Sequence, residues 1–122
     1  LFDYGAISKT KEAALLNIQA IHAQINYQTK EQKSQYKLAK MRILTANAKI
    51  KSALSALNAA SSAFVTIEKK YNVGIVDYVV YLETLTKKTN TKALYERSLN
   101  DLEVAYATLY FYEAKDIKEE LK

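Results

Sequence analysis

Apolar residues recur along most of this chain at alternating steps of three and four, the spacing of a helix that packs lengthwise against another helix. One such row begins at Ala14 and, after a break, ends at Tyr71. The pattern predicts a helix over residues 9–71, with Ser8 as its N-cap. The same spacing restarts after a short interruption and predicts a second helix over residues 77–120.

Both predicted helices carry a second apolar row beside the first. In the first helix, the main row has a stutter between Gln28 and Ala39, where its steps are four, four and three. The second row there is rich in alanine and consists of Ala13, Leu16, Ala20, Ala23, Tyr27, Leu38, Met41, Ala48, Ala59 and Ala63. In the second helix, the main row is Tyr78, Tyr81, Leu85, Lys88, Lys92, Tyr95, Leu99, Leu102, Tyr106 and Leu109. Two rows indicate either a neighbour on each side or one broad core stripe of an ordinary bundle, and the spacing alone favours neither.

The two helices are separated by a short segment around Gly74, one of only two glycines in a chain without proline. An isolated glycine between two long periodic segments indicates the tip of a helical hairpin, because glycine allows a backbone with positive φ. The sequence therefore predicts an all-α fold, a long antiparallel coiled-coil hairpin with its tip turn at residues 72–76. This tip is unusually apolar, which suggests a docking site formed by Tyr71, Asn72, Val73, Gly74, Ile75 and Val76. The alternative is that these residues only close the hairpin.

Composition limits the functions that such a hairpin could have. The chain has 122 residues, a net charge of +5 and no cysteine, which suits a single domain without disulfides or thiolate metal sites. Its one histidine, His22, has no second ligand residue nearby in the sequence, so we expect no metal site and no cofactor. No catalytic constellation or phosphate-binding loop is present, and we expect no enzyme activity and no catalytic residues. Nucleic-acid binding is disfavoured because no basic stripe with interleaved aromatic residues is evident.

Three segments of the chain resemble the second structural repeat of the TolC-like outer membrane efflux proteins. The opening LFDYG at residues 1–5 is similar to the family's junction between a barrel strand and a long periplasmic helix. The YNVG at residues 71–74 is similar to its hairpin tip. The segment from Asp77 to Leu85, with the alanine, tyrosine and leucine positions that follow it, is similar to the start of the returning helix.

The resemblance implies a particular assembly and location. The chain would be one periplasmic α-hairpin, residues 1–122, cut from a longer protein of a Gram-negative bacterium. The intact protein would be a homotrimer whose helices form a twelve-helix α-barrel, continuous with an outer membrane β-barrel of which a strand ends at Leu1-Phe2. Its tip would dock on a periplasmic adaptor joined to an inner-membrane pump, in a tripartite efflux or type I secretion system. The alternative is the coiled-coil hairpin of the periplasmic adaptor (membrane fusion) protein itself, a binding module. We expect the separated hairpin to self-associate, as an antiparallel four-helix bundle.

The resemblance also suggests entrance carboxylates at Asp77 and Glu83, since the family often carries acidic residues just above the tip. Each has a simpler interpretation: Asp77 as the N-cap of the second helix, and Glu83 as a solvated helix residue. Val76 and Val80 are apolar where relatives can hold charged residues, which argues against a salt-bridged latch. Ala114 replaces a glycine that is common before the return to the barrel.

Overall fold

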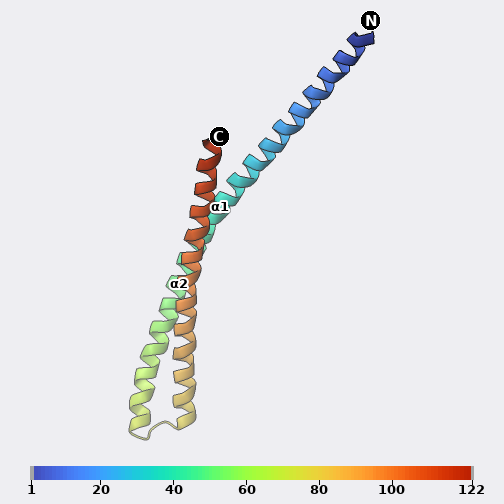
Figure 1. Cartoon of the computed structure of the whole chain (residues 1–122). Coiled ribbons are helices and arrows are strands. Elements are labelled where there is room, and N and C mark those ends of the chain that lie inside the picture. The colour runs from blue at the N-terminus through green and yellow to red at the C-terminus, as the bar shows by residue number, and fades with distance from the viewer. Residues whose placement is uncertain (1, 122) are drawn as a thin grey trace.

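The computed structural model describes residues 2–121, which form two long helices joined by a tight turn (Figure 1). Helix α1 spans Phe2–Asn72 and helix α2 spans Tyr78–Glu120. At 1.5 Å per residue, α1 is about 105 Å long and α2 about 65 Å. The two helices run antiparallel and pack against each other, and residues 2–121 contain no β-strand. The predicted all-α helical hairpin is confirmed.

Helix α1 begins seven residues earlier than the sequence predicted. Ser8, expected as the N-cap, lies inside the helix, and the hydroxyl of Thr10 already donates a hydrogen bond to the carbonyl of Ala6 (2.8 Å). Phe2 is helical and does not end a strand, while Leu1 lies outside the described residues. The reason is that this segment has no proline, and Gly5 alone costs a helix only about 1 kcal/mol.

The contact between the helices is a regular heptad seam in which small and large residues alternate. On α1 the buried small residues recur at every seventh position, as Ala39, Ala46, Ala53 and Ala60. The larger residues between them are half-buried or, in the case of Phe64, buried. Alanine at every second layer of the seam lets the two helices approach closely.

The seam on α2 differs in part from the predicted row. Small residues again recur at every seventh position, but three of the four are polar: Thr84, Thr91, Ser98 and Ala105. Tyr81, Lys88, Tyr95, Leu102 and Leu109 fill the layers between them, as predicted. Of the other members of the predicted row, Tyr78, Lys92, Leu99 and Tyr106 are exposed. Apolarity alone did not predict these seam positions on α2. Close helix packing requires small side chains, and threonine and serine are small although they are polar.

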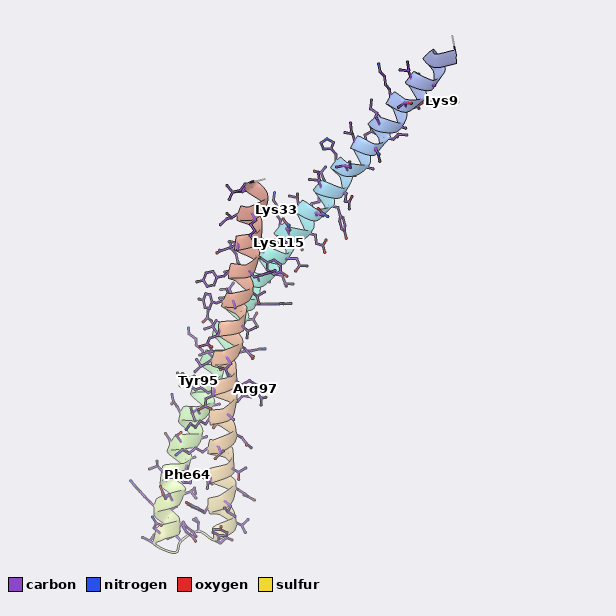
Figure 2. All side chains as sticks on the ribbon, viewed as in Figure 1. Lys9, Lys33, Phe64, Tyr95, Arg97 and Lys115 are labelled. Carbon is purple, nitrogen blue, oxygen red and sulfur yellow. The ribbon has the colours of Figure 1, made fainter. Side chains whose placement is uncertain are left out.

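The helices remain in one register from the tip to the fork where they part. Tyr71 and Tyr78 are in ring contact at the tip, and Tyr36 is hydrogen-bonded to Glu113 at the fork. Each helix advances by the same 35 residues between these two contacts, so neither contains an insertion relative to the other. Beyond the fork α1 continues alone, and Figure 1 shows its N-terminal part leaving the direction of α2. Every described side chain in residues 5–31 is exposed, and Figure 2 shows the side chains of this part of α1, such as Lys9, projecting from a single helix.

Candidate docking site at the hairpin tip

Gly74 ends helix α1 with a specific hydrogen-bonded cap. Its φ is +79°, the only positive φ among the described residues. The amide of Gly74 donates to the carbonyl of Tyr71 (3.0 Å), and the amide of Ile75 donates to the carbonyl of Lys70 (2.8 Å). This pair of bonds around a left-handed residue is the Schellman motif, which satisfies the last free carbonyls of a helix. Gly74 is therefore required by the fold, whatever else it contacts.

Asp77 begins helix α2 as its N-cap. Its Oδ1 accepts a hydrogen bond from the backbone amide of Val80, three residues on, at 3.0 Å. That amide is one of the four at a helix N-terminus that have no partner within the helix. Helix α2 accordingly begins at Tyr78, and the tip turn is residues 73–77, one residue later than predicted. The N-cap interpretation of Asp77 is confirmed, and its carboxylate is engaged with the backbone.

Four aromatic rings brace the tip from behind. The ring of Tyr71 stacks on Tyr81 at 4.7 Å between centroids and lies 6.2 Å from Tyr78. The Tyr81 ring in turn lies 5.7 Å from that of Phe64, and the Lys88 ammonium lies over the Phe64 ring, 4.6 Å from its centroid. Such contacts join the last turns of α1 to the first turns of α2. These ring contacts thus fix the ends of the two helices on either side of the turn.

The exposed apolar side chains of the turn have no part in the two helix caps or the aromatic contacts. Val73 is 70% exposed and Ile75 is 71% exposed, whereas Val76 and Tyr71 are half-buried and Asn72 is the last residue of α1. A Cβ added to Gly74 would have no atom within 4 Å, so the space beside the turn is open. The side chains of Val73 and Ile75 take no part in the cap hydrogen bonds or in the ring contacts of the tip. An apolar pair projecting from a braced turn fits contact with another protein.

Glu83 lies one and a half turns into α2 and is exposed. It lies six residues after Asp77, outside the turn, and a role for either carboxylate at a tunnel entrance stays a prediction. The carboxylate of Asp77 accepts a hydrogen bond from the Val80 amide, whereas Glu83 is an exposed residue on the surface of α2. Within residues 2–121, no group of three histidine, cysteine, aspartate or glutamate side chains is placed to hold a metal ion.

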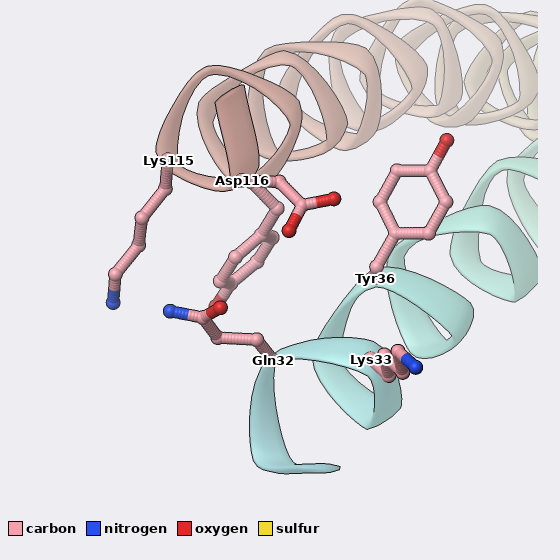
Figure 3. Close-up of a pocket in the computed structure, with 6 residues that line it drawn as sticks. Gln32, Lys33, Tyr36, Lys115 and Asp116 are labelled. Carbon is pink, nitrogen blue, oxygen red and sulfur yellow. The ribbon is translucent and has the colours of Figure 1, made fainter. Parts of the chain in front are cut away.

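A second feature, which the sequence did not indicate, lies at the fork (Figure 3). The hydroxyl of Tyr36 donates to Glu113 Oε1 (3.2 Å), and the hydroxyl of Tyr112 donates to Gln35 Oε1 (2.6 Å). Beside these bonds is a hollow of about 260 Å³ to which both helices contribute, lined by Gln32, Lys33, Tyr36, Tyr112, Lys115 and Asp116. The reciprocal hydrogen bonds fasten the end of α2 to α1. Both tyrosines occupy seam positions. Their hydrogen-bond partners could not be identified from the sequence, because these depend on the register of α1 against α2.

The geometry defines this molecule as a two-helix antiparallel coiled-coil hairpin with a capped, apolar tip. No segment of residues 2–121 forms a helix both long and apolar enough to cross a bilayer. No family model, curated protein or solved structure matches the chain.

Proposed function

We propose that this hairpin is part of the periplasmic wall of an outer membrane channel, and that it conducts solutes or polypeptides without catalysis. In this proposal hairpins stand side by side as a closed tube of helices, and the apolar tips dock on an adaptor joined to an inner-membrane pump. The observation that carries it is the chemistry of the two sides of the hairpin that face away from the seam.

These outer edges consist of the residues midway between successive seam positions. At about 100° per residue, a position two residues from each of its seam neighbours lies opposite the seam. On α1 the edge is Ser34, Met41, Ala48, Ser55, Ser62 and Lys69; on α2 it is Val79, Thr86, Ala93, Asn100, Ala107 and Ala114. All twelve residues are exposed and eleven carry no charge. A two-helix coil surrounded by water normally places its charged residues on this side. Uncharged, mostly small edges are instead suited to close contact with a further helix on each side.

The amount of exposed surface supports the same conclusion. The chain has an accessible surface of 10074 Å². A compact protein of its mass, 13.8 kDa, exposes about 6,600 Å². The excess is about 3,400 Å², whereas one side of a standard protein interface takes about 800 Å². The hairpin thus has enough uncovered surface for neighbours along both edges.

The tip supports the docking part of the proposal. Within the turn, residues 73–77, Val73 and Ile75 are the exposed apolar residues, and neither side chain belongs to the cap or the aromatic cluster. A tubular wall needs a partner at its open end, and an apolar contact at the end of each hairpin provides one. The resemblance of the LFDYG and YNVG segments to the TolC-like family supplies the identity of the tube and the expected homotrimer. An adaptor hairpin, the alternative, would account for an apolar tip but gives no reason for two uncharged edges.

The test uses the intact protein from the envelope of its source organism. We expect a trimer by light scattering in detergent and ion-conducting pores in planar bilayers. The double substitution Val73→Asp and Ile75→Asp should leave trimer and pores intact and abolish export of a fluorescent dye or other cargo from cells. The matched control is Leu44→Asp, because Leu44 is also 70% exposed but lies far from the tip. A monomeric intact protein without pores would refute the channel, and normal export by the tip variant would refute the docking role.

A further inference from the structure

The two broad sides of the hairpin, between its outer edges, are not alike. One side, the grooved face, carries a series of hollows along the line where α1 and α2 meet. A hollow of about 390 Å³ is lined in part by Arg42, Lys49 and Asp101, and one of about 270 Å³ in part by Ala59 and Lys87. Nearer the fork, a further hollow of about 380 Å³, lined in part by Gln35 and Lys115, continues the same face. The other side, the opposite face, includes Lys51 and Leu54.

On α1 the two faces also differ in side-chain size. Between residues 44 and 66, the grooved face is built from Thr45, Ser52, Ala56, Ala59, Ala63 and Thr66, with Lys49 as its one long side chain. Over the same length the opposite face has Leu44, Asn47, Lys51, Leu54, Asn58 and Val65, with one small residue, Ser61. A ring of helices has a shorter circumference inside than outside, so its members must be narrower on the concave side. The smaller residues of α1 therefore favour the grooved face as the concave one.

The faces differ in charge as well. Arg97 and Glu83 belong to the grooved face, because they precede its residue Val104 by seven and by three times seven positions. Over residues 34–66 and the facing residues 83–115, that face carries the cations Arg42, Lys49, Lys87, Arg97 and Lys115 against the anions Glu83 and Asp101. Over the same lengths the opposite face carries Lys37, Lys40, Lys51 and Lys92 against Glu96, Glu103 and Glu113. The net charge is therefore +3 on the grooved face and +1 on the opposite face, so the grooved face has the larger excess of cations.

From these differences we infer that the grooved face lines the tunnel and that its excess of cations makes the passage favour anionic solutes. The inference rests on the proposed function, because only a closed tube has a lumen. Charges on the wall of a narrow aqueous passage raise the local concentration of ions of opposite sign. Glu83 lies on the same face, one turn from Lys87, and lowers the positive potential near the tip without reversing it.

The test is a comparison of two lysines that are two residues apart and lie on different faces. Lys49 lines a hollow of the grooved face, and Lys51 lies on the opposite face; both are exposed. The intact protein is placed in planar bilayers under a gradient of potassium chloride, and the reversal potential gives the chloride-to-potassium permeability ratio. We expect a ratio above one for the unmodified protein. Lys49→Glu should lower it on the order of threefold at low salt, and Lys51→Glu should leave it unchanged.

A second pair, Lys87→Glu against Lys92→Glu, repeats the comparison on α2, and circular dichroism verifies that each variant is as helical as the parent. The outcomes separate the two proposals. An intact protein that forms no pores contradicts the channel itself. Pores whose selectivity responds to Lys51→Glu and Lys92→Glu, or to none of the four substitutions, overturn the assignment of the grooved face while leaving the channel standing. A parent that prefers potassium also overturns the inference.

Discussion

Replacing Gly74 by alanine should weaken the hairpin through the backbone alone. The φ of +79° places residue 74 in the left-handed region, where a Cβ costs about 1–2 kcal/mol. Steric contact adds nothing to this figure, because a Cβ built on Gly74 meets no other atom within 4 Å. We therefore expect Gly74→Ala to lower the free energy of unfolding by about 1–2 kcal/mol. Gly74→Asn should cost less, because asparagine tolerates this conformation better than other residues with a side chain.

The assay is urea unfolding followed by circular dichroism at 222 nm, at one fixed protein concentration because self-association would shift the midpoint. The chain provides its own control in Gly5, which is helical and also has open space around it. Gly5→Ala should leave stability unchanged or raise it by up to about 1 kcal/mol. Gly74→Ala should thus lower the free energy of unfolding, whereas Gly5→Ala should not. An unchanged or increased stability in Gly74→Ala would refute the Schellman cap as the reason for glycine at the tip.

Three further predictions concern the cap, the seam and the exposed surface. Asp77→Ala should cost about 1 kcal/mol in urea unfolding because the Val80 amide loses its acceptor, whereas Asp77→Asn should retain most of the stability; equal losses would contradict the N-cap. Ala53→Leu should destabilise the seam by about 1–3 kcal/mol, since Ala53 is 5% exposed, while Ala48→Leu on the outer edge should not; the same unfolding assay distinguishes them. The separated 122-residue chain should self-associate through its edges and the uncovered row Ile18, Ile21 and Ile25, and a monomer in light scattering at millimolar concentration would contradict this.

Features fixed by neighbouring residues could be predicted from the sequence. The isolated Gly74 indicated the turn, and Asp77 directly before an apolar helix start indicated the cap; both depend only on local backbone chemistry. The heptad row of α1 was predicted from residue 36 to residue 71 because its large members are all apolar. In each of these features the residues that determine the structure lie close together in the sequence.

Features that depend on the relation of α1 to α2 were missed or partly wrong. Thr91 and Ser98 were not assigned to the seam. They fit there because their side chains are small, and a pattern based on hydropathy does not detect small polar residues. The hydrogen bonds of Tyr36 and Tyr112 require the register of two helices that are far apart in the sequence at this point. Docking by Val73 and Ile75 stays a prediction, because an exposed apolar turn identifies a contact surface but not its partner.

The central claim is that both outer edges are covered by further helices in the intact assembly. The most direct measurement is the rate of maleimide labelling of single cysteines in the assembled intact protein, using a background without other reactive cysteines. Ser55→Cys and Ala93→Cys report on the two edges, and Lys51→Cys, on a broad face, is the exposed reference. We predict that both edge cysteines react far more slowly than the reference and gain its rate when the assembly is unfolded. Edge cysteines that react in the assembly as fast as Lys51→Cys would contradict the account.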